Sequence, residues 1–60
     1  MYYVLYKDAG GYWRWRLRAA NNKTIADSGE GYFNRSDALS GIALVKQSSN
    51  APVREASGAF

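Results

Sequence analysis

The sequence predicts a single α+β domain over residues 1–60: a three-stranded antiparallel meander, one helix and a short C-terminal strand (β-β-β-α-β). Residues 12–18 alternate strictly between apolar residues and arginines, a two-residue period typical of a strand with one face on a core and the other in water. Turn signals flank this stretch, and an apolar stripe at helical spacing follows Asn34. We expect strands over about 2–7, 12–19, 23–28 and 52–56, and a helix over about 35–47.

The first hairpin is predicted to close through an odd-length loop. Residues 2–7 are aromatic and β-branched, as strands often are, and residues 8–10 (Asp-Ala-Gly) fit a three-residue loop with Gly10 in the left-handed region. A loop of two or four residues would place Leu5 among the arginines, because a one-residue slip exchanges the two faces of a strand. The odd loop predicts two cross-strand pairs on the core face, Leu5 with Trp13 and Tyr3 with Trp15.

The third strand follows an Asn-Asn turn signal at 21–22. A two-residue turn there places Ile25 with the arginines, whereas a three-residue loop over 20–22 places it opposite Leu17 on the core face. We prefer the longer loop because it buries the isoleucine. The Gly-Glu-Gly run at 29–31 is expected to end this strand and to return two aromatic residues to the core, Tyr32 and Phe33.

A helix is expected to begin after Asn34, a favourable N-cap, with Asp37 completing a weak capping-box pattern in the positive first turn. Gly41 lies near the edge of the apolar stripe, and the favoured explanation for a glycine inside a helix is close packing on the sheet. Leu44 lies well off the stripe. The stripe itself comprises Ala38, Leu39, Ile42 and Val45.

A polar connector at 48–50 leads to the last expected strand at 52–56, which starts with Pro52, where a missing backbone donor does least harm. Residues 57–60 are expected to be a frayed tail. The connector spans only about 13–14 Å, and a connector too short to fold back favours exchange between copies. The last strand could cover an edge of its own sheet or of a second copy's sheet, and the sequence leaves both possibilities open. The side chains expected in the core or at a dimer contact are Tyr3, Leu5, Trp13, Trp15, Leu17, Ile25, Leu39, Ile42, Val45 and Val53.

The size of the chain favours self-association. A domain of 60 residues buries only about 60% of its unfolded surface. The chain contains no Cys and no His, so neither a disulfide nor a thiolate or imidazole metal site supplements the core. We therefore expect a homodimer with no cofactor and no metal. The absence of a long apolar run and of a signal peptide predicts a cytoplasmic protein without membrane contact.

Short motifs run through most of the chain: Tyr-Lys-Asp at 6–8, Trp-Arg-Trp-Arg-Leu at 13–17, Ala-Ala-Asn at 19–21, Gly-Tyr at 31–32, Gly-Ile at 41–42 and Ala-Pro-Val at 51–53. With these motifs the chain resembles the YegP-like family, small bacterial proteins whose function is unassigned. The resemblance implies either two tandem β-β-β-α-β units or one unit that dimerises, with the units exchanging their last strands within a joint sheet. For a chain with the length of one unit, it implies a homodimer in which residues 52–56 reach across to the partner.

The chain departs from the family pattern at two positions. Asn22 stands where glycine is common, which strains the turn slightly, and Trp13 stands where the family often has a smaller residue, which widens the apolar face. The family has no established catalytic residues, so the resemblance assigns none to this chain.

One strand face is a candidate for single-stranded nucleic acid, with aromatic rings stacking on bases and guanidiniums holding phosphates. Its residues are Tyr12, Arg14, Arg16 and Arg18. The favoured interpretation is a solvated face, because exposed arginines are common on strands and a net charge of +3 is a mild excess. Its guanidiniums would then stack on tyrosines or pair with the nearest carboxylates, Asp27, Glu30 or Glu55.

An enzymatic role is not predicted. The carboxylates lack the paired spacing that a general acid and base require, and the serines have no adjacent base to activate them. Trp13 and Trp15 fit a core or a dimer contact better than a ligand pocket, because they alternate with arginines beside Leu17. The leading prediction is a non-catalytic α+β homodimer of unassigned biochemical role, acting as an interaction module.

Overall fold

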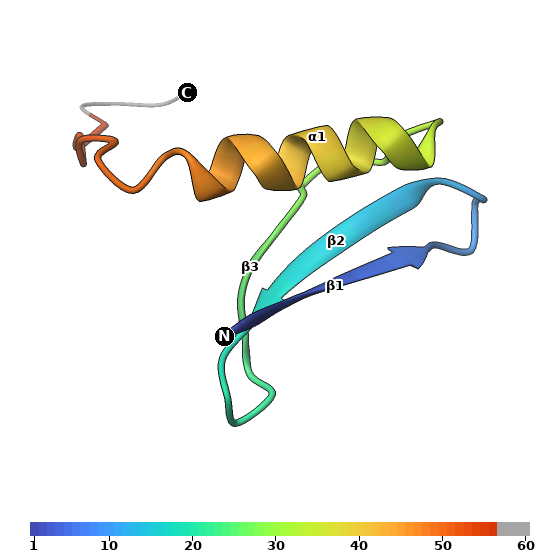
Figure 1. Cartoon of the computed structure of the whole chain (residues 1–60), viewed down its shortest axis with the longest axis horizontal. Helices are drawn as coiled ribbons and strands as arrows, with labels where there is room; N and C mark the ends of the chain where they lie inside the picture. The colour runs from blue at the N-terminus through green and yellow to red at the C-terminus, as the bar shows by residue number, and fades with distance from the viewer. Residues whose placement is uncertain (57–60) are drawn as a thin grey trace.

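The computed structural model describes residues 1–56, so the tail expected at 57–60 lies outside the described residues. Its strands are β1 (Tyr2–Lys7), β2 (Trp13–Arg18) and β3 (Thr24–Asp27), and its helix is α1 (Arg35–Lys46). The strands form an antiparallel sheet in the order β1-β2-β3, and α1 lies across one face of it (Figure 1). The predicted α+β class, with a meander followed by a helix, is confirmed.

The first hairpin closes through an odd-length loop, but one residue later than predicted. The Asp8 amide donates to the Tyr12 carbonyl at 2.8 Å and the Gly11 amide to the Asp8 carbonyl at 3.0 Å. Gly11, with φ of 84°, takes the left-handed position expected for Gly10, because Asp8 occupies the first position of the turn. The observed core-face pairs are therefore Leu5 with Trp15 and Tyr3 with Leu17. The predicted pairs were wrong by two residues, a shift that leaves every side chain on its predicted face.

The second hairpin has the preferred three-residue loop over 20–22. The Ala19 amide donates to the Lys23 carbonyl at 2.9 Å, and Asn22 is left-handed with φ of 68°. The register then shifts, with Arg18 paired to Thr24 and Leu17 paired to Ala26. Ile25 is the extra residue of this β-bulge and is 56% exposed, so its predicted place opposite Leu17 was wrong.

Beyond β3 the chain returns to pair with the start of β2. Trp13 and Tyr32 exchange two backbone hydrogen bonds of 2.8 Å each, and the Ser28 amide donates to the Trp15 carbonyl at 3.0 Å. Tyr32 packs against the core, as expected. Phe33 is 84% exposed and does not, because consecutive residues of an extended segment point to opposite sides.

The core lies between β2 and α1. Its buried residues are Trp15, Ala38 and Ile42, and its partly buried residues are Tyr3, Leu5, Trp13, Tyr32 and Val45. Leu39, expected in the core, is 41% exposed in the single chain. Asn34 is the N-cap residue, but its side chain donates to the Asp37 carboxylate at 3.2 Å rather than accepting from a helix amide.

Gly41 allows α1 to approach the sheet closely. A Cβ at this position would lie 2.7 Å from Tyr32 Oη and 3.3 Å from Trp15 Nε1. Both distances are shorter than ordinary van der Waals contact between such atoms. The packing explanation for this glycine therefore agrees with the geometry, since a larger residue requires the tyrosine to move.

The expected strand at 52–56 does not form within a single copy. These residues have no regular structure, all of them are exposed, and the Val53 side chain is 97% exposed. The segment leaves the end of α1 and lies off the sheet (Figure 1). Pairing of this segment with a second copy stays a prediction.

We expect Gly41→Ala to destabilise the protein by about 1–2 kcal/mol through overpacking, although alanine favours a helix interior by about 0.8–1 kcal/mol. Thermal unfolding at fixed concentration should show a midpoint lower by about 4–8 °C per kcal/mol. Ser40→Ala, on the exposed side of the same turn, is the matched control and should change stability by less than about 0.5 kcal/mol. The cost should shrink in a Tyr32→Phe background, and a raised midpoint for Gly41→Ala alone would contradict the packing argument.

Candidate functional site

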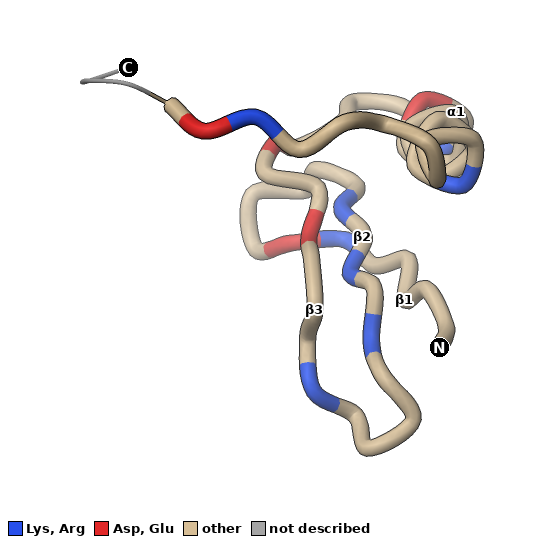
Figure 2. Tube along the Cα trace, turned by 90° about the vertical axis from the view of Figure 1, so that its left-hand side faces the viewer, with Lys and Arg blue, Asp and Glu red and all other residues tan. Residues whose placement is uncertain are grey.

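The sheet has one face covered by α1 and one that no element of residues 1–56 covers. The register places eight strand side chains on this second face, here called the open face: Tyr2, Val4, Tyr6, Arg14, Arg16, Arg18, Thr24 and Asp27. The basic residues follow β2 along its length (Figure 2). The predicted alternation of β2, with Trp13, Trp15 and Leu17 on the other face, therefore agrees with the structure.

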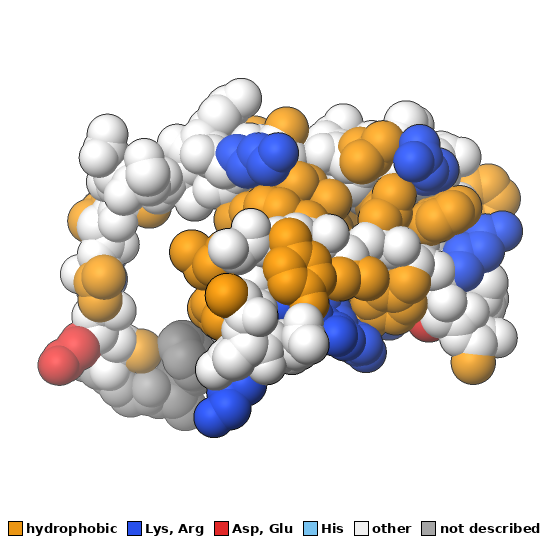
Figure 3. All heavy atoms as spheres, turned by 60° about the horizontal axis from the view of Figure 1, so that its bottom comes forward, with side chains coloured by type: hydrophobic (Ala, Val, Ile, Leu, Met, Phe, Trp, Pro, Cys, Tyr) orange, Lys and Arg blue, Asp and Glu red, His pale blue; other side chains and the backbone are white. Residues whose placement is uncertain are grey.

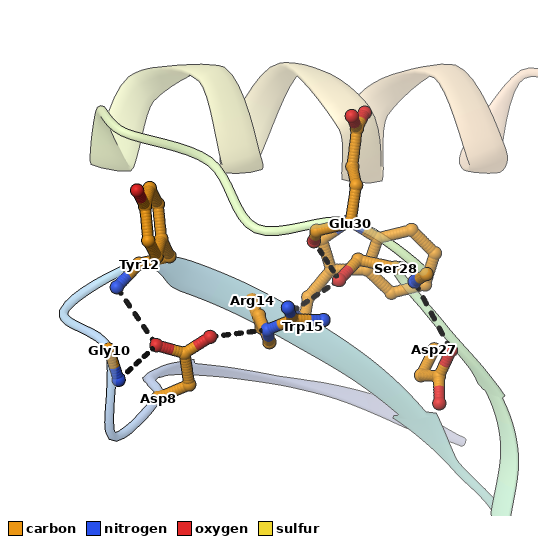
Figure 4. A network of polar contacts seen from close by, with 9 residues as sticks. Asp8, Gly10, Tyr12, Arg14, Trp15, Asp27, Ser28 and Glu30 are labelled. Atoms are coloured by element: carbon orange, nitrogen blue, oxygen red, sulfur yellow. Dashed lines mark hydrogen bonds and ion pairs between the residues drawn. The ribbon is translucent and has the colours of Figure 1, made fainter.

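Arg14 is held by Asp8 in the first hairpin. The Asp8 carboxylate accepts hydrogen bonds from the Gly10 amide at 2.9 Å, the Tyr12 amide at 3.0 Å and Arg14 Nε at 2.5 Å (Figure 4). The hydrogen bond from Arg14, followed by that from the Tyr12 amide, lowers the pKa of Asp8, and the same ion pair raises the pKa of Arg14. Most of the hydrogen-bonding capacity of this carboxylate is therefore used inside the hairpin.

Sequence reasoning missed this ion pair because it considered Asp27, Glu30 and Glu55 as partners for the arginines. The signal was available in the hairpin register. Asp8 lies opposite Tyr12 at the end of the ladder, so Arg14 is its diagonal neighbour, and diagonal pairs on one face are within reach of long side chains. Placing the loop one residue too early concealed that relation.

Arg16 and Arg18 are held differently. The Arg16 guanidinium carbon lies 4.5 Å from the centroid of the Tyr6 ring, a cation–π contact on the open face. Arg18 Nε is buried and has no hydrogen-bond partner within residues 1–56. In the same part of the chain neither arginine forms an ion pair, although Asp27 is the ladder partner of Arg16. The Asp27 carboxylate instead accepts the Gly29 amide at 3.2 Å.

Two tyrosines at the ends of this region make contacts within the two hairpins. The Tyr2 hydroxyl hydrogen-bonds to Asn22 Oδ1 in the second hairpin, and Tyr2 remains 41% exposed. Tyr12 belongs to the first hairpin and packs against Gly31, where a Cβ would lie 2.7 Å from the Tyr12 Cβ. Of the four residues predicted as a binding face, Arg16 and Arg18 are the two without a carboxylate partner or a hairpin role. Binding at this face stays a prediction.

The loop between β3 and α1 is tied to β2 by a serine. Ser28 Oγ donates to the Glu30 carbonyl at 2.9 Å, and the Trp15 amide donates to Ser28 Oγ at 3.5 Å (Figure 4). With the Asp27–Gly29 hydrogen bond, this contact fixes the turn that brings Tyr32 back to β2. The turn therefore positions the core rather than a reactive group.

On the helix side the two tryptophans differ in their surroundings. Trp15 is buried and makes an edge-to-face contact with Tyr3, with ring centroids 5.9 Å apart. Trp13 is half-buried, with Lys7 Nζ 5.4 Å and the Arg35 guanidinium carbon 6.0 Å from its ring centroid. No pocket is found in the part of the chain that the structure describes. This arrangement matches the core interpretation of the tryptophans.

The core is incompletely covered beside β1. Lys46 Nζ lies 5.6 Å from the Tyr3 ring centroid, which places the end of α1 over the start of β1. Leu39, two turns earlier, lies on the same side of the helix as Lys46. We call this side, formed by Tyr3, Leu5 and Leu39, the β1 flank. Figure 3 shows apolar side chains gathered in a band between the helix and the sheet, with basic side chains around it.

Other kinds of site find little support within residues 1–56. No cluster of three or more acidic, His or Cys side chains is arranged there to hold a metal ion. Among the same residues, no helix combines the length and the apolar character that crossing a bilayer requires. The open face and the β1 flank are therefore the two surfaces whose chemistry we consider.

Known proteins are similar to this chain in sequence and in fold. A family model described as "Domain of unknown function (DUF1508)" matches residues 8–55. Two UPF0339 proteins of Neisseria meningitidis, from serogroups B and A, are each 46% identical over 56 residues, covering 92% of this chain and 98% of the relative. A protein from Haloferax volcanii, with a solution structure determined by NMR, matches with a TM-score of 0.86 and 41% identity, covering 92% of this chain and 93% of that one.

The Asp8–Arg14 pair should make stability depend on pH in the acid range. Because the folded state lowers the pKa of Asp8, the stabilisation is complete above the carboxyl's unfolded value, near pH 4, and is lost as pH falls through the lower folded value. Thermal midpoints measured from pH 6 to pH 2 should fall less for Asp8→Asn than for the natural chain. Glu30→Gln is the control and should follow the natural chain, because Glu30 is exposed and only its backbone carbonyl is hydrogen-bonded within residues 1–56. Midpoint curves for Asp8→Asn that run parallel to those of the natural chain would contradict this account.

Proposed function

This chain belongs to the DUF1508 family, the YegP-like proteins that carry no assigned function, and from its geometry we propose that it is a non-catalytic interaction module working as a homodimer. In this dimer, residues 51–56 of each copy lie along the β1 flank of the other. The observation that carries the proposal is the position of Val53, 97% exposed on a segment that lies off its own sheet.

The small size of the core is an argument for a further segment that packs over it. Within residues 1–56 three residues are buried. Leu39 remains 41% exposed although it lies on the same side of α1 as Lys46, which contacts Tyr3. Burying apolar area contributes about 25 cal/mol per Å², so a small domain gains from every further side chain that is covered. A valine placed between Leu39 and Leu5 would extend the core in the direction in which it is open.

The sheet edges favour β1 over β3 as the acceptor. β1 is six residues long and pairs with β2 without interruption, so its outer edge presents a regular row of backbone donors and acceptors. β3 is four residues long and carries a bulge at Ile25, which interrupts a ladder and discourages pairing. We therefore expect an added strand to pair with the outer edge of β1 through regular backbone hydrogen bonds.

The connector directs the segment away from its own copy. The Ser48 amide and Oγ both donate to the Val45 carbonyl, at 3.0 and 2.6 Å, and the Ala51 amide donates to the Ser48 carbonyl at 2.8 Å. These hydrogen bonds continue the helix end into a tight turn. The segment then leaves the body of the molecule (Figure 1), as an arm that reaches a neighbour does.

The side-chain chemistry supports binding rather than catalysis. The Asp8 carboxylate has a lowered pKa and is held by two amides and a guanidinium, so it is a poor proton donor and a weak base near neutral pH. The chain has no His or Cys to act as base or nucleophile. Its exposed apolar segment and its uncovered flank are features of an interaction surface.

Analytical ultracentrifugation over a dilution series should give twice the mass of one chain at micromolar concentration. Val53→Ser should weaken the dimer, because two symmetry-related valines each lose about 1.5 kcal/mol of burial, which raises the dissociation constant about 100-fold. Leu44→Ser is the matched control, since Leu44 is exposed on the opposite side of α1 from Leu39, and should leave the dimer unchanged. A monomer at 100 µM, or equal effects of both variants, would refute the proposal.

A further inference from the structure

We propose that the open face binds single-stranded nucleic acid through Arg16 and Arg18, with Tyr2 and Tyr6 as the adjacent aromatic surface. This inference concerns the face opposite α1 and does not depend on dimer formation. It differs from the sequence prediction in its residues, because Arg14 is bound to Asp8 and Tyr12 belongs to the first hairpin.

The first argument is the charge left on this face after internal pairing. Asp8 neutralises Arg14, whereas Arg16 and Arg18 form no ion pair within the described chain. Asp27, the remaining carboxylate on the face, accepts a backbone amide from Gly29. Arg16 and Arg18 are separated by one residue on a strand, about 6.8 Å apart at the backbone, and neither has a carboxylate partner. Because Arg18 Nε is buried, Arg18 would bind phosphate oxygens through its two terminal nitrogens, one of the bidentate geometries of a guanidinium.

The second argument is the arrangement of aromatic rings beside these arginines. The Arg16 guanidinium already lies 4.5 Å from the Tyr6 ring centroid, and its outer plane offers a surface on which a base can stack. Tyr2 is the ladder partner of Arg18 and is 41% exposed. Alternating rings and guanidiniums on a sheet are the arrangement that single-strand binding proteins use without reading sequence.

The shape of the face selects this ligand over others of the same charge. A small anionic ligand requires a concave site, and no pocket is found in residues 1–56. A duplex requires an element that enters a groove, whereas in the described chain α1 lies on the opposite face (Figure 1). A sheet face without a pocket in the described residues, carrying rings and guanidiniums, suits a strand whose bases are unpaired.

The test is fluorescence anisotropy with a labelled oligothymidylate of about 15 nucleotides, long enough to cover one such site. The affinity of the natural protein should fall with salt at a log–log slope of about −1.4, for two phosphate contacts at about −0.7 each. The variant Arg16→Gln/Arg18→Gln should bind about 25-fold more weakly at 0.1 M salt by the same slope. The control Arg35→Gln/Lys46→Gln removes equal charge from the helix side and should bind within about twofold of the natural protein.

Three results would overturn the proposal: no binding at 20 mM salt, equal losses in the two double variants, or equal affinity for inorganic polyphosphate or an acidic peptide. The last would show that charge alone, or a protein partner, explains the face. If Arg16→Gln/Arg18→Gln fails to fold, NMR titration of the natural protein decides the question. Amide shifts should then change along β1 and β2 and not along α1, and the opposite distribution would refute the assignment.

Discussion

The contact between Trp15 and α1 is the constraint on which the rest of this small structure depends. Trp15 lies in the central strand opposite Leu5, is hydrogen-bonded through its backbone to Ser28, and is covered by the helix at Gly41. The two hairpins and the Ser28 turn bring their elements to this one side chain. Trp15, Ala38 and Ile42 are the buried side chains of residues 1–56. Little other apolar burial within these residues holds the helix and the sheet together, so positions around Trp15 tolerate little change in volume.

Much of the fold could be predicted from the sequence because the relevant signals are local. The alternation of β2 predicts its two faces, and the odd-length loops keep each strand on its predicted face. The stripe beyond Asn34 predicts a helix over about 35–47, and the structure has it over Arg35–Lys46. The exact register could not be predicted, since Gly10 and Gly11 both tolerate the left-handed position. The choice between them depends on which residue the Asp8 side chain can cap.

The candidate site could be predicted as a face but not residue by residue. Alternation placed the three arginines of β2 together, yet their separate environments follow from neighbours that pairing brings close: Asp8 for Arg14 and Tyr6 for Arg16. The bulge at Ile25 had no sequence signal, because a β-branched residue in a strand predicts regular pairing. Leu39 was predicted in the core or at a dimer contact from its place on the helical stripe, and Val53 from its place in the expected last strand. In the single copy they are 41% and 97% exposed.

In the proposed dimer, the exposed arm at residues 51–56 would link the lifetime of this protein to its abundance. When a second copy stabilises a folded chain, the degree of stabilisation follows mass action, and a lone copy leaves an irregular, accessible backbone that proteases cleave readily. In the proposed dimer, newly made chains would therefore be cleared while they are scarce and would persist once they meet a twin. The protein would then accumulate only when its concentration exceeds the level at which it dimerises. This level would depend on an arm of a few residues rather than on a separate degradation signal.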